Sequence, residues 1–173
     1  MPESSWAWTS PHSSASGGRR EAKSNLRNLS TNLAVQLGRA TEDLNRHWYE
    51  ANTGQVVKDI QRRVHHPSLA WMAATLDGVV EKRGSVFEAK FMLPWSFSEE
   101  SAAEKHMAQL QHNMCLTGSR TAVLSIITGG GKWVEITIPA DKLFQHVLVA
   151  AEQKFWACVE SGEPPRLFGA EAL

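Results

Sequence analysis

Three ionisable residues that lie close together in the sequence define the chemistry this chain can offer. The segment LDGVVEKRGSVFEAK, residues 76–90, holds Asp77 in a Leu-Asp-Gly turn and continues into an apolar run with Glu88, Ala89 and Lys90. Side chains alternate between the two faces of a strand, so we expect Glu88 and Lys90 to share one face and Ala89 to point into the core. Two carboxylates and an ammonium would then converge at the end of a hairpin. Such a group can hold a hard divalent cation and a nucleophilic water against a phosphodiester.

The same residues also fit ordinary structural roles. Asp77 followed by Gly78 is a common turn pair, and Glu88 with Lys90 fits the solvated face of a strand. The spacing Asp-x10-Glu-x-Lys is loose, and many unrelated hairpins would match it. The rest of the sequence is therefore needed to distinguish a metal-binding catalytic site from a hairpin with no such role.

Length and composition indicate one globular domain. The chain has 173 residues, of which 42% are hydrophobic and 21% charged, and both values are ordinary for a soluble protein. Residues 1–24, rich in Ser, Gly and Pro, predict a flexible basic tail, and residues 25–173 a single domain. No apolar stretch is long enough to span a bilayer and no signal-peptide pattern is present. We therefore expect a cytoplasmic protein that contacts no membrane.

Charge and cysteine content bear on the class of protein. A formal net charge of zero is not typical of a simple nucleic-acid binder. Residues 1–40 nevertheless carry five basic against two acidic residues, so the remainder of the chain is net negative. An acidic metal site would contribute to that excess, as would any solvated surface. Cys115 and Cys158 are too few for a disulfide framework or a four-cysteine iron–sulfur cluster, and we expect two buried thiols.

Helices and strands are expected in the order of an α/β fold. Gly54 and Gly118 are candidate helix stops, Ser98 is a candidate helix start, and the cluster Thr41–Asp43 is a candidate cap. The last helix carries apolar residues along one stripe, which is typical of an amphipathic helix. The expected elements are a helix over 33–51, a short strand within 55–66, strands over 70–80 (interrupted by Gly78) and 85–91, a helix over 98–117, a hairpin of strands 121–128 and 133–138, and a helix over 141–161.

Five pieces of sequence, taken together in order and spacing, resemble a known family. They resemble the phage-type recombination exonucleases, the lambda exonuclease and YqaJ viral recombinase family of the PD-(D/E)XK nuclease superfamily, over roughly residues 33–165. The resemblance implies an α/β fold with a PD-(D/E)XK restriction-endonuclease-like core, a mixed β-sheet flanked by α-helices. The pieces are GRATEDLNRHWYEANTG at 38–54, ATLDG at 74–78, FEAK at 87–90, HMAQLQHNMCLTG at 106–118 and KFWACVESGEPP at 154–165.

The resemblance also implies roles for individual residues. The family's acidic residue on its first helix falls on Glu42, and a glutamine on its crossover helix falls on Gln109. The carboxylates and one peptide carbonyl would bind Mg²⁺, for which Mn²⁺ can substitute. The implied catalytic residues are Asp77, Glu88, Lys90 and Gln109, and the implied metal-binding residues are Glu42, Asp77, Glu88 and Ala89 through its carbonyl.

Other residues have simpler interpretations. Glu42 also fits an acidic residue that the helix dipole favours near a helix start. His106 and His112 lie six apart on one expected helix and share a face poorly, so we expect no histidine zinc site. Most of the seven tryptophans fit core or interface packing, although one could stack on a base. Trp156 is expected to pack against Phe155.

The implied function is Mg²⁺-dependent hydrolysis of DNA by a 5′-to-3′ exonuclease that resects duplex ends for phage-type recombination. Double-stranded DNA ends are the expected substrate, a single-strand annealing protein is an expected partner, and a ring of three subunits is the expected assembly. A structure-specific endonuclease with the same site is one alternative. Another is a truncated, catalytically inactive DNA-binding prophage remnant, because the family's Thr-Ala-Ser segment and 5′-phosphate arginine upstream of Glu42 are not found. Arg19, Arg20 and Lys23 occupy that place.

Overall fold

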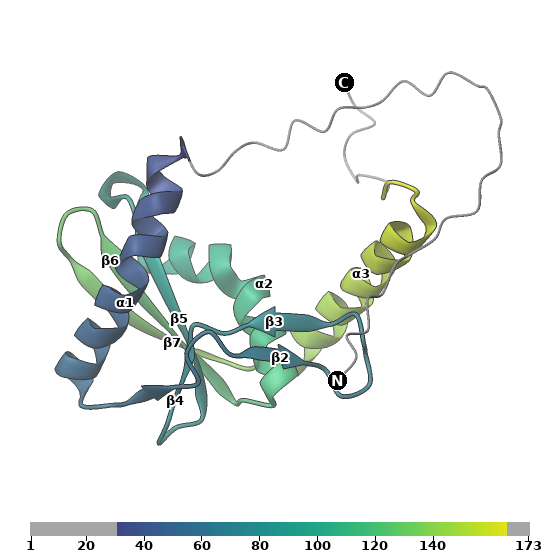
Figure 1. Ribbon diagram of the computed structural model, residues 1–173, viewed down its shortest axis with the longest axis horizontal. Helices are drawn as coiled ribbons and strands as arrows, with labels where there is room; N and C mark the ends of the chain where they lie inside the picture. The colour runs from purple at the N-terminus through teal and green to yellow at the C-terminus, as the bar shows by residue number, and fades with distance from the viewer. Residues whose placement is uncertain (1–30, 166–173) are drawn as a thin grey trace, which may run out of the picture.

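The fold is built on one mixed β-sheet with helices against both faces, as expected. The computed structural model describes residues 31–165 (Figure 1). Its helices are α1 (Leu33–Thr53), α2 (Glu99–Thr117) and α3 (Lys142–Ser161), and a short 3-10 helix, η2 (Pro94–Ser96), precedes α2. Its strands are β1 (Val57–Lys58), β2 (Arg63–His65), β3 (Ala73–Thr75), β4 (Gly78–Val80), β5 (Ser85–Met92), β6 (Thr121–Thr128) and β7 (Trp133–Pro139).

The main sheet has five strands in the order β1-β4-β5-β6-β7. Strands β5 and β6 are parallel, from the pair Val86↔Ala122 to the pair Met92↔Thr128, and the other neighbours are antiparallel. Parallel strands need a crossover connection, and α2 provides it. Strands β6 and β7 form the predicted hairpin, while β2 and β3 form a separate two-stranded ribbon.

Strand β5 lies between two hydrophobic clusters. On one face Phe87 and Ala89 pack with Tyr49 of α1, and the Tyr49 and Phe87 rings have centroids 5.1 Å apart. On the other face Val86 belongs to the cluster that contains Leu110 of α2. Alternation along β5 thus sends successive side chains to α1 and to α2. Because β5 is packed on both faces, its polar side chains are held at fixed positions between the sheet and the helices.

Helix α1 begins earlier than its predicted cap. Asn32 caps it, and the Asn32 side chain accepts the backbone N–H of Ala34 at 3.0 Å. The predicted cap at Thr41–Asp43 is therefore wrong, since the Thr41 hydroxyl donates to a carbonyl one turn back inside the helix. Gly54 ends α1 with a φ of 66°, as predicted. Glu42 consequently lies well within α1, so a favourable interaction with the helix dipole at the start of α1 does not account for an acidic residue at this position.

The predicted strand over 70–80 is two short strands with different partners. Strand β3 pairs with β2 and β4 pairs with β1, and Asp77 lies at the switch between them. Gly78 is needed here for close approach: a Cβ atom on it would lie 2.3 Å from Val57 Cγ1 and 3.2 Å from the Lys58 carbonyl oxygen. The missing side chain lets β1 reach β4, and this places Asp77 at the margin of the main sheet.

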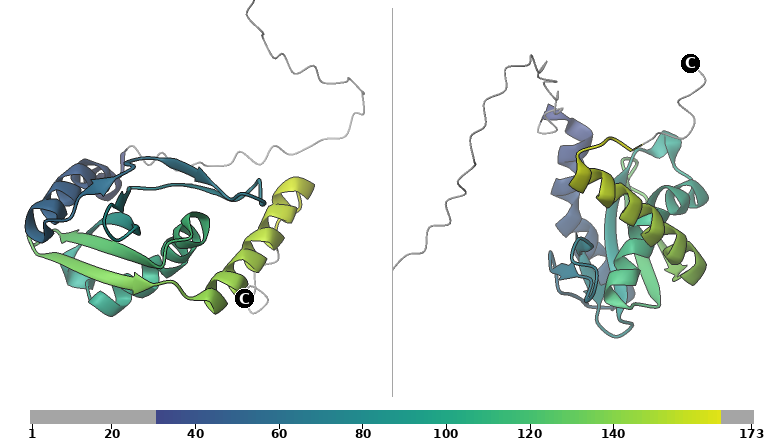
Figure 2. Two further views of the ribbon diagram at one scale, coloured as in Figure 1. Left: turned by 90° about the horizontal axis from the view of Figure 1, so that it is seen from below. Right: turned by 90° about the vertical axis from the view of Figure 1, so that its right-hand side faces the viewer.

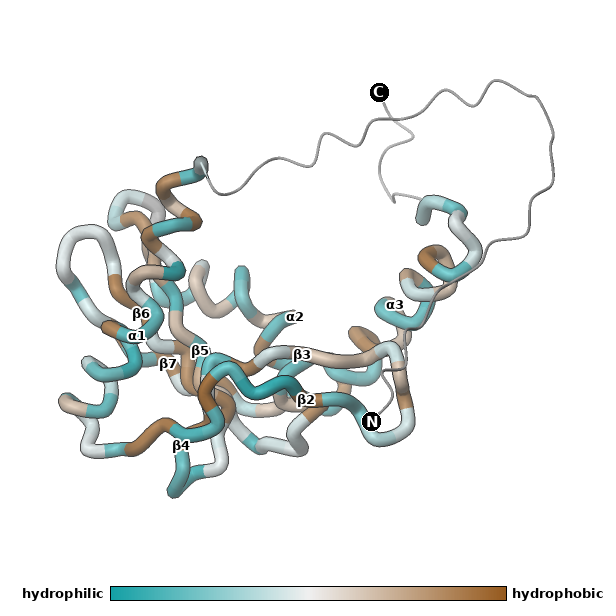
Figure 3. Tube along the Cα trace, viewed as in Figure 1, coloured by the Kyte–Doolittle hydropathy of each residue, from teal (hydrophilic) through white to brown (hydrophobic). Residues whose placement is uncertain are grey.

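Helix α3 projects from the body of the fold (Figure 2). An amphipathic stripe normally faces a core, yet Leu143 is 75% exposed, Val147 61% and Phe155 56%. Figure 3 shows apolar positions recurring along this projecting helix. Trp156 stacks on Trp71, with ring centroids 6.5 Å apart. The predicted packing of Trp156 on Phe155 is therefore wrong, because neighbouring residues leave a helix in different directions.

Two other expectations concern the surroundings of the protein. Within residues 31–165, no helix combines the length and the apolar character needed to cross a membrane.

Cys115 and Cys158 are free thiols, but both are partly exposed rather than buried as predicted. The predicted tail over residues 1–24, with its basic residues, lies outside the described residues.

Candidate active site

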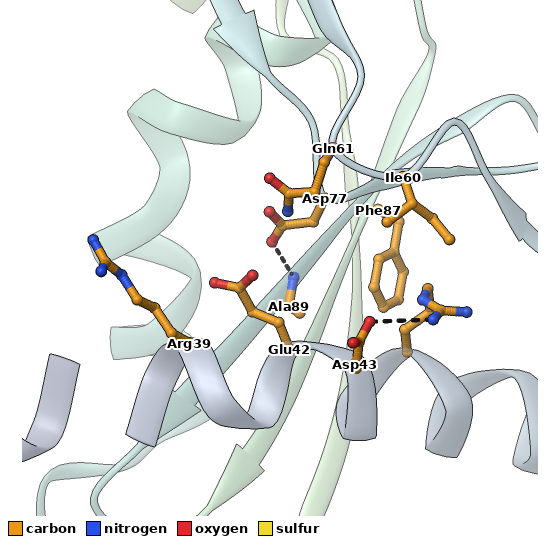
Figure 4. A pocket seen from close by; sticks show the side chains of 9 residues that line it. Arg39, Glu42, Asp43, Ile60, Gln61, Asp77, Phe87 and Ala89 are labelled. Atoms are coloured by element: carbon orange, nitrogen blue, oxygen red, sulfur yellow. Dashed lines mark hydrogen bonds and ion pairs between the residues drawn. The ribbon is translucent and has the colours of Figure 1, made fainter. Parts of the chain in front are cut away.

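Asp77 lies at an open edge of strand β5. The pairing of β4 with β5 ends at Gly78↔Phe87, so β5 continues to Met92 without a strand neighbour on that side. Oδ2 of Asp77 accepts the backbone N–H of Ala89 at 3.0 Å, in place of a strand carbonyl (Figure 4). The N–H and C=O of one residue in an extended strand point to the same edge, so the Ala89 carbonyl faces Asp77 as well. A carboxylate and a peptide carbonyl are thus presented side by side.

Glu88 lies on the α2 face of β5 and is 1% exposed. Lys90 Nζ contacts Glu88 Oε1 in an ion pair, which confirms that the two side chains share a face. From α2, Gln109 Nε2 donates to Oε1 at 2.6 Å and Asn113 Nδ2 to Oε2 at 3.4 Å. Residues 109 and 113 are four apart on a helix and so lie on one side of it. Helix α2 therefore supplies the hydrogen bonds that orient this buried carboxylate.

Glu42 reaches the same edge of β5 from α1. With Asp77 and Ala89 it lines a cavity of about 150 Å³, and Figure 4 shows its carboxylate directed toward both residues. Burial and the charge of Asp77 raise the pKa of Glu42, while the ammonium of Lys90 opposes that rise. The predicted residues thus surround one end of β5, with Glu42 on the α1 side and Gln109 on the α2 side.

The oxygen donors at this edge fit a Mg²⁺ ion that keeps several waters. Within residues 31–165, no three His, Cys, Asp or Glu side chains gather as a metal-binding cluster. Mg²⁺ usually takes one or two carboxylates and retains several waters. Asp77, Glu88 and the Ala89 carbonyl supply ligand oxygens of the type that this ion binds. Burial and the charge of Asp77 raise the pKa of Glu88 to about 7, although Lys90 and Gln109 oppose the rise. A divalent cation bound here would offset the contribution that the charge of Asp77 makes to this rise.

His106 is a further residue at this site, and sequence reasoning had considered it only as a zinc ligand. It precedes Gln109 by one turn of α2, on the stripe that also carries Asn113. Burial and the charges of Lys90 and Lys105 lower the pKa of His106 to about 4, so the ring is neutral at pH 7. A neutral imidazole can donate one hydrogen bond to a phosphate. Its helical spacing from Gln109 is the signal that could have identified it.

Asn45 anchors α1 to the sheet beneath the site, and sequence reasoning missed it. It follows Glu42 by one turn, and its amide donates to the carbonyls of Ser125 at 2.9 Å and Lys90 at 3.2 Å. The Ser125 hydroxyl donates to Asn45 Oδ1 at 2.6 Å and accepts the indole N–H of Trp133 at 2.9 Å. This buried network couples the position of Glu42 to that of Lys90. No spacing rule in the sequence joins residues 45, 125 and 133.

Gln111 has a structural role, although it lies only two residues from Gln109. Its amide donates to the carbonyl of Pro139 at 2.9 Å. Its oxygen accepts the backbone N–H of Asp141 at 3.0 Å and the side-chain amide of Gln145 at 3.1 Å. Residues two apart on a helix face different ways. Gln111 therefore joins α2 to the start of α3, and Gln109 faces the candidate site.

Known proteins share this sequence pattern. The model of the YqaJ-like viral recombinase domain matches residues 9–120. The chain is 26% identical over 145 residues to the uncharacterized protein YqaJ of Bacillus subtilis (strain 168). That alignment covers 80% of this chain and 46% of the relative, so the chain spans slightly less than half of the relative's length.

Solved structures share the fold. An alkaline exonuclease from Laribacter hongkongensis, LHK-Exo, has a TM-score of 0.63 at 20% identity, with 76% of this chain and 71% of that chain covered. A phage related exonuclease from Haemophilus somnus 129PT has a TM-score of 0.58 at 16% identity, with 75% and 73% covered. At these identities the likeness concerns the fold, and it confirms the fold class expected from the sequence. Because the family model matches more than half of the residues, the chain belongs to the family of YqaJ-like viral recombinase domains.

Proposed function

We propose that this protein is a metal-dependent deoxyribonuclease that hydrolyses phosphodiester bonds. The observation that carries the proposal is the contact of Lys90 and Gln109 with the buried carboxylate of Glu88, beside Asp77 at the open edge of β5. Burial, and after it the charge of Asp77, raises the pKa of Glu88, although Lys90 and Gln109 oppose the rise. The oxygen donors gathered at this edge of the strand support a cation-dependent reaction on an anionic substrate.

The residues of the candidate site would have different roles in the reaction. Mg²⁺, or Mn²⁺ in its place, would lower the pKa of a bound water and neutralise charge on the phosphate. Lys90 would orient the attacking water and offset the negative charge that grows on the phosphoryl oxygens. The amide of Gln109 would donate to a non-bridging oxygen of the scissile phosphate. The residues proposed to hold the metal are Asp77, Glu88, Ala89 through its carbonyl, and Glu42.

The proposed substrate is the end of double-stranded DNA, resected in the 5′-to-3′ direction. Support comes from the recombinase domain family and from the fold shared with an alkaline exonuclease and a phage related exonuclease. The 3′ single strands left by such resection would be substrates for a single-strand annealing protein. We propose a ring of three copies as the working assembly, in the cytoplasm of a bacterial or prophage-carrying host.

A cleavage assay with two DNA topologies tests this function. Purified protein is incubated with an end-labelled linear duplex and with a closed-circular duplex, in Mg²⁺, in Mn²⁺ or in chelator. We expect linear duplex to shorten from its 5′ ends in either metal, closed circles to persist, and chelator to stop the reaction. Cleavage of closed circles would show an endonuclease instead. DNA binding without cleavage in either metal would show an inactive binding protein.

A further inference from the structure

The loop between β1 and β2, residues 59–62, has an unusual backbone conformation. Asp59 and Gln61 have φ values of 55° and 54°, and they are the non-glycine residues with positive φ within residues 31–165. Aspartate tolerates the left-handed region, whereas glutamine rarely adopts it because its Cβ approaches a carbonyl oxygen. Such conformations persist where surrounding contacts enforce them, and they concentrate at functional sites. The conformation of Gln61 is therefore the unusual one in this loop, and it indicates a functional position.

Strand pairing holds this loop beside Asp77. Strand β1 pairs with β4 and β2 with β3, so the segment joining β1 to β2 lies along the segment joining β3 to β4, which contains Asp77. The Leu76 N–H donates to the Arg62 carbonyl at 3.0 Å. The Arg62 guanidinium donates to Asp59 Oδ2 at 2.7 Å. The loop is thus fixed by both flanking strands and by its own contacts.

The side chain of Gln61 faces the cavity of the candidate active site. It lines that cavity together with Glu42 and Asp77. Figure 4 shows its amide beside Asp77, near the Glu42 carboxylate. The side chain is exposed, and no residue within 31–165 forms a hydrogen bond with its amide. The strained backbone therefore directs a free donor toward the site, and the fold itself does not use that donor.

We propose that Gln61 is a substrate-contacting residue whose amide N–H groups bind a phosphate oxygen of the DNA strand in this cavity. The inference rests on the proposed nuclease function. A lysine or arginine at position 61 would form an ion pair with Asp77 or Glu42 and would be held away from the strand. A neutral amide donates to an anionic phosphate without that competition. The geometry thus favours glutamine in a loop beside clustered carboxylates.

Glycine substitution separates the contact from the backbone strain. Gln61→Gly removes the amide. It also removes the strain of the left-handed backbone conformation, because glycine adopts positive φ readily. Asp59→Gly is the matched control, because it places glycine at the other positive-φ position of the same loop, at a residue that does not line the cavity. Both variants are assayed in Mg²⁺ for KM and kcat on linear duplex, and by thermal melting. Binding of a short fluorescein-labelled duplex is measured by anisotropy in chelator.

We expect Gln61→Gly to melt at or above the wild-type temperature and yet to raise KM or Kd for duplex about tenfold or more, as loss of a hydrogen bond to a charged group predicts. Asp59→Gly should keep the wild-type KM and Kd within about twofold, since it loses only an exposed ion pair. A Gln61→Gly enzyme with wild-type KM and Kd would overturn the inference while leaving the nuclease proposal intact. A wild-type protein that neither cleaves nor binds duplex would overturn both.

Discussion

Helices α2 and α3 are almost equal in length, at 19 and 20 residues, but they relate to the sheet in opposite ways. Helix α2 buries six residues, including the polar Gln111 and Asn113, whereas α3 buries only Gln145. The apolar stripe on α3 is the clearer of the two, yet most of it is exposed. Helix α2 therefore packs into the fold although its apolar stripe is weak, and the clearer apolar stripe of α3 does not mark a core-facing helix.

Chain connectivity explains the difference. Helix α2 joins two parallel neighbouring strands and must lie across the sheet between them. Helix α3 follows the edge strand β7, and within residues 31–165 no later strand draws it back onto a face of the sheet. It is held by the contacts of Gln111 at its start, by the contact of His112 with Glu152 at 2.7 Å, and by the stack of Trp71 on Trp156. The chemistry is therefore expected to depend on α1, α2 and β5 and to be insensitive to α3.

The largest expected effect sharpens this comparison with two lysine substitutions. Lys90→Ala should lower the cleavage rate by about 10³-fold, because the ammonium that offsets transition-state charge is lost. Lys154→Ala, at an exposed position of α3, should leave the rate unchanged. Mn²⁺ affinity, measured by isothermal titration calorimetry, should stay near the wild-type value in Lys90→Ala, since no ligand oxygen is removed. Equal rate losses for both variants would contradict the comparison.

The next effect concerns pH. The pKa of Glu88, about 7 in the folded protein, exceeds its ordinary value of 4.5, so the folded state binds more protons between these two pH values. Stability from this group is therefore full below pH 4.5 and is lost as pH rises through about 7. Glu88→Gln should be more stable than wild type at pH 8, by about 3 kcal/mol at most, and no more stable at pH 4. Urea unfolding at both pH values measures the difference, and saturating Mg²⁺ should remove it at pH 8.

A smaller effect is expected from the polar anchor of α1. Asn45→Ala should lower the free energy of unfolding by about 2 kcal/mol, because buried hydrogen-bonding groups lose their partner. Asn52→Ala is a matched control on the same helix. Asn52 is exposed, and within residues 31–165 its side chain forms one hydrogen bond, to the Trp48 carbonyl, so the loss should stay within about 0.5 kcal/mol. Urea titrations compare the two. Equal stability of the two variants would show that the buried network does not anchor the helix.

The smallest effect is expected on α3. Val147→Ser and Phe155→Ser, singly, should each change the free energy of unfolding by less than about 0.5 kcal/mol, because both side chains are already mostly exposed. Cleavage rates should equal the wild-type rate. A loss of several kilocalories per mole in the urea titration would mean that this face is covered in solution, and it would end the contrast with α2.

Local signals in the sequence predicted most of the fold. Ser98 and Gly118 delimit α2 as expected, with the Ser98 hydroxyl accepting the N–H of Ser101 at 3.1 Å. The strand alternation that places Glu88 and Ala89 on opposite faces is also confirmed. The failures concern features that depend on distant partners. The division of residues 70–80 into two strands depends on which strands lie beside them, and such pairing leaves no local signal.

The candidate site shows the same division. Asp77 and Glu88 could be predicted to meet because a hairpin and strand alternation bring them to one edge, and the family resemblance added Gln109 from the crossover helix. Asn45 and Gln61 could not be predicted. Asn45 is one polar residue among several on α1, and its partners are remote in sequence. Gln61 lies in a loop whose backbone conformation follows from tertiary pairing.

The most direct test of the account is the cleavage rate of Asp77→Asn on linear duplex DNA in Mg²⁺. This change keeps an oxygen that can accept the Ala89 N–H but removes the charge that a cation requires. We expect wild-type protein to cleave in Mg²⁺ and not in chelator, and Asp77→Asn to be slower by about 10³-fold or more while melting near the wild-type temperature. Cleavage by Asp77→Asn at the wild-type rate in Mg²⁺ would contradict the assignment of the active site.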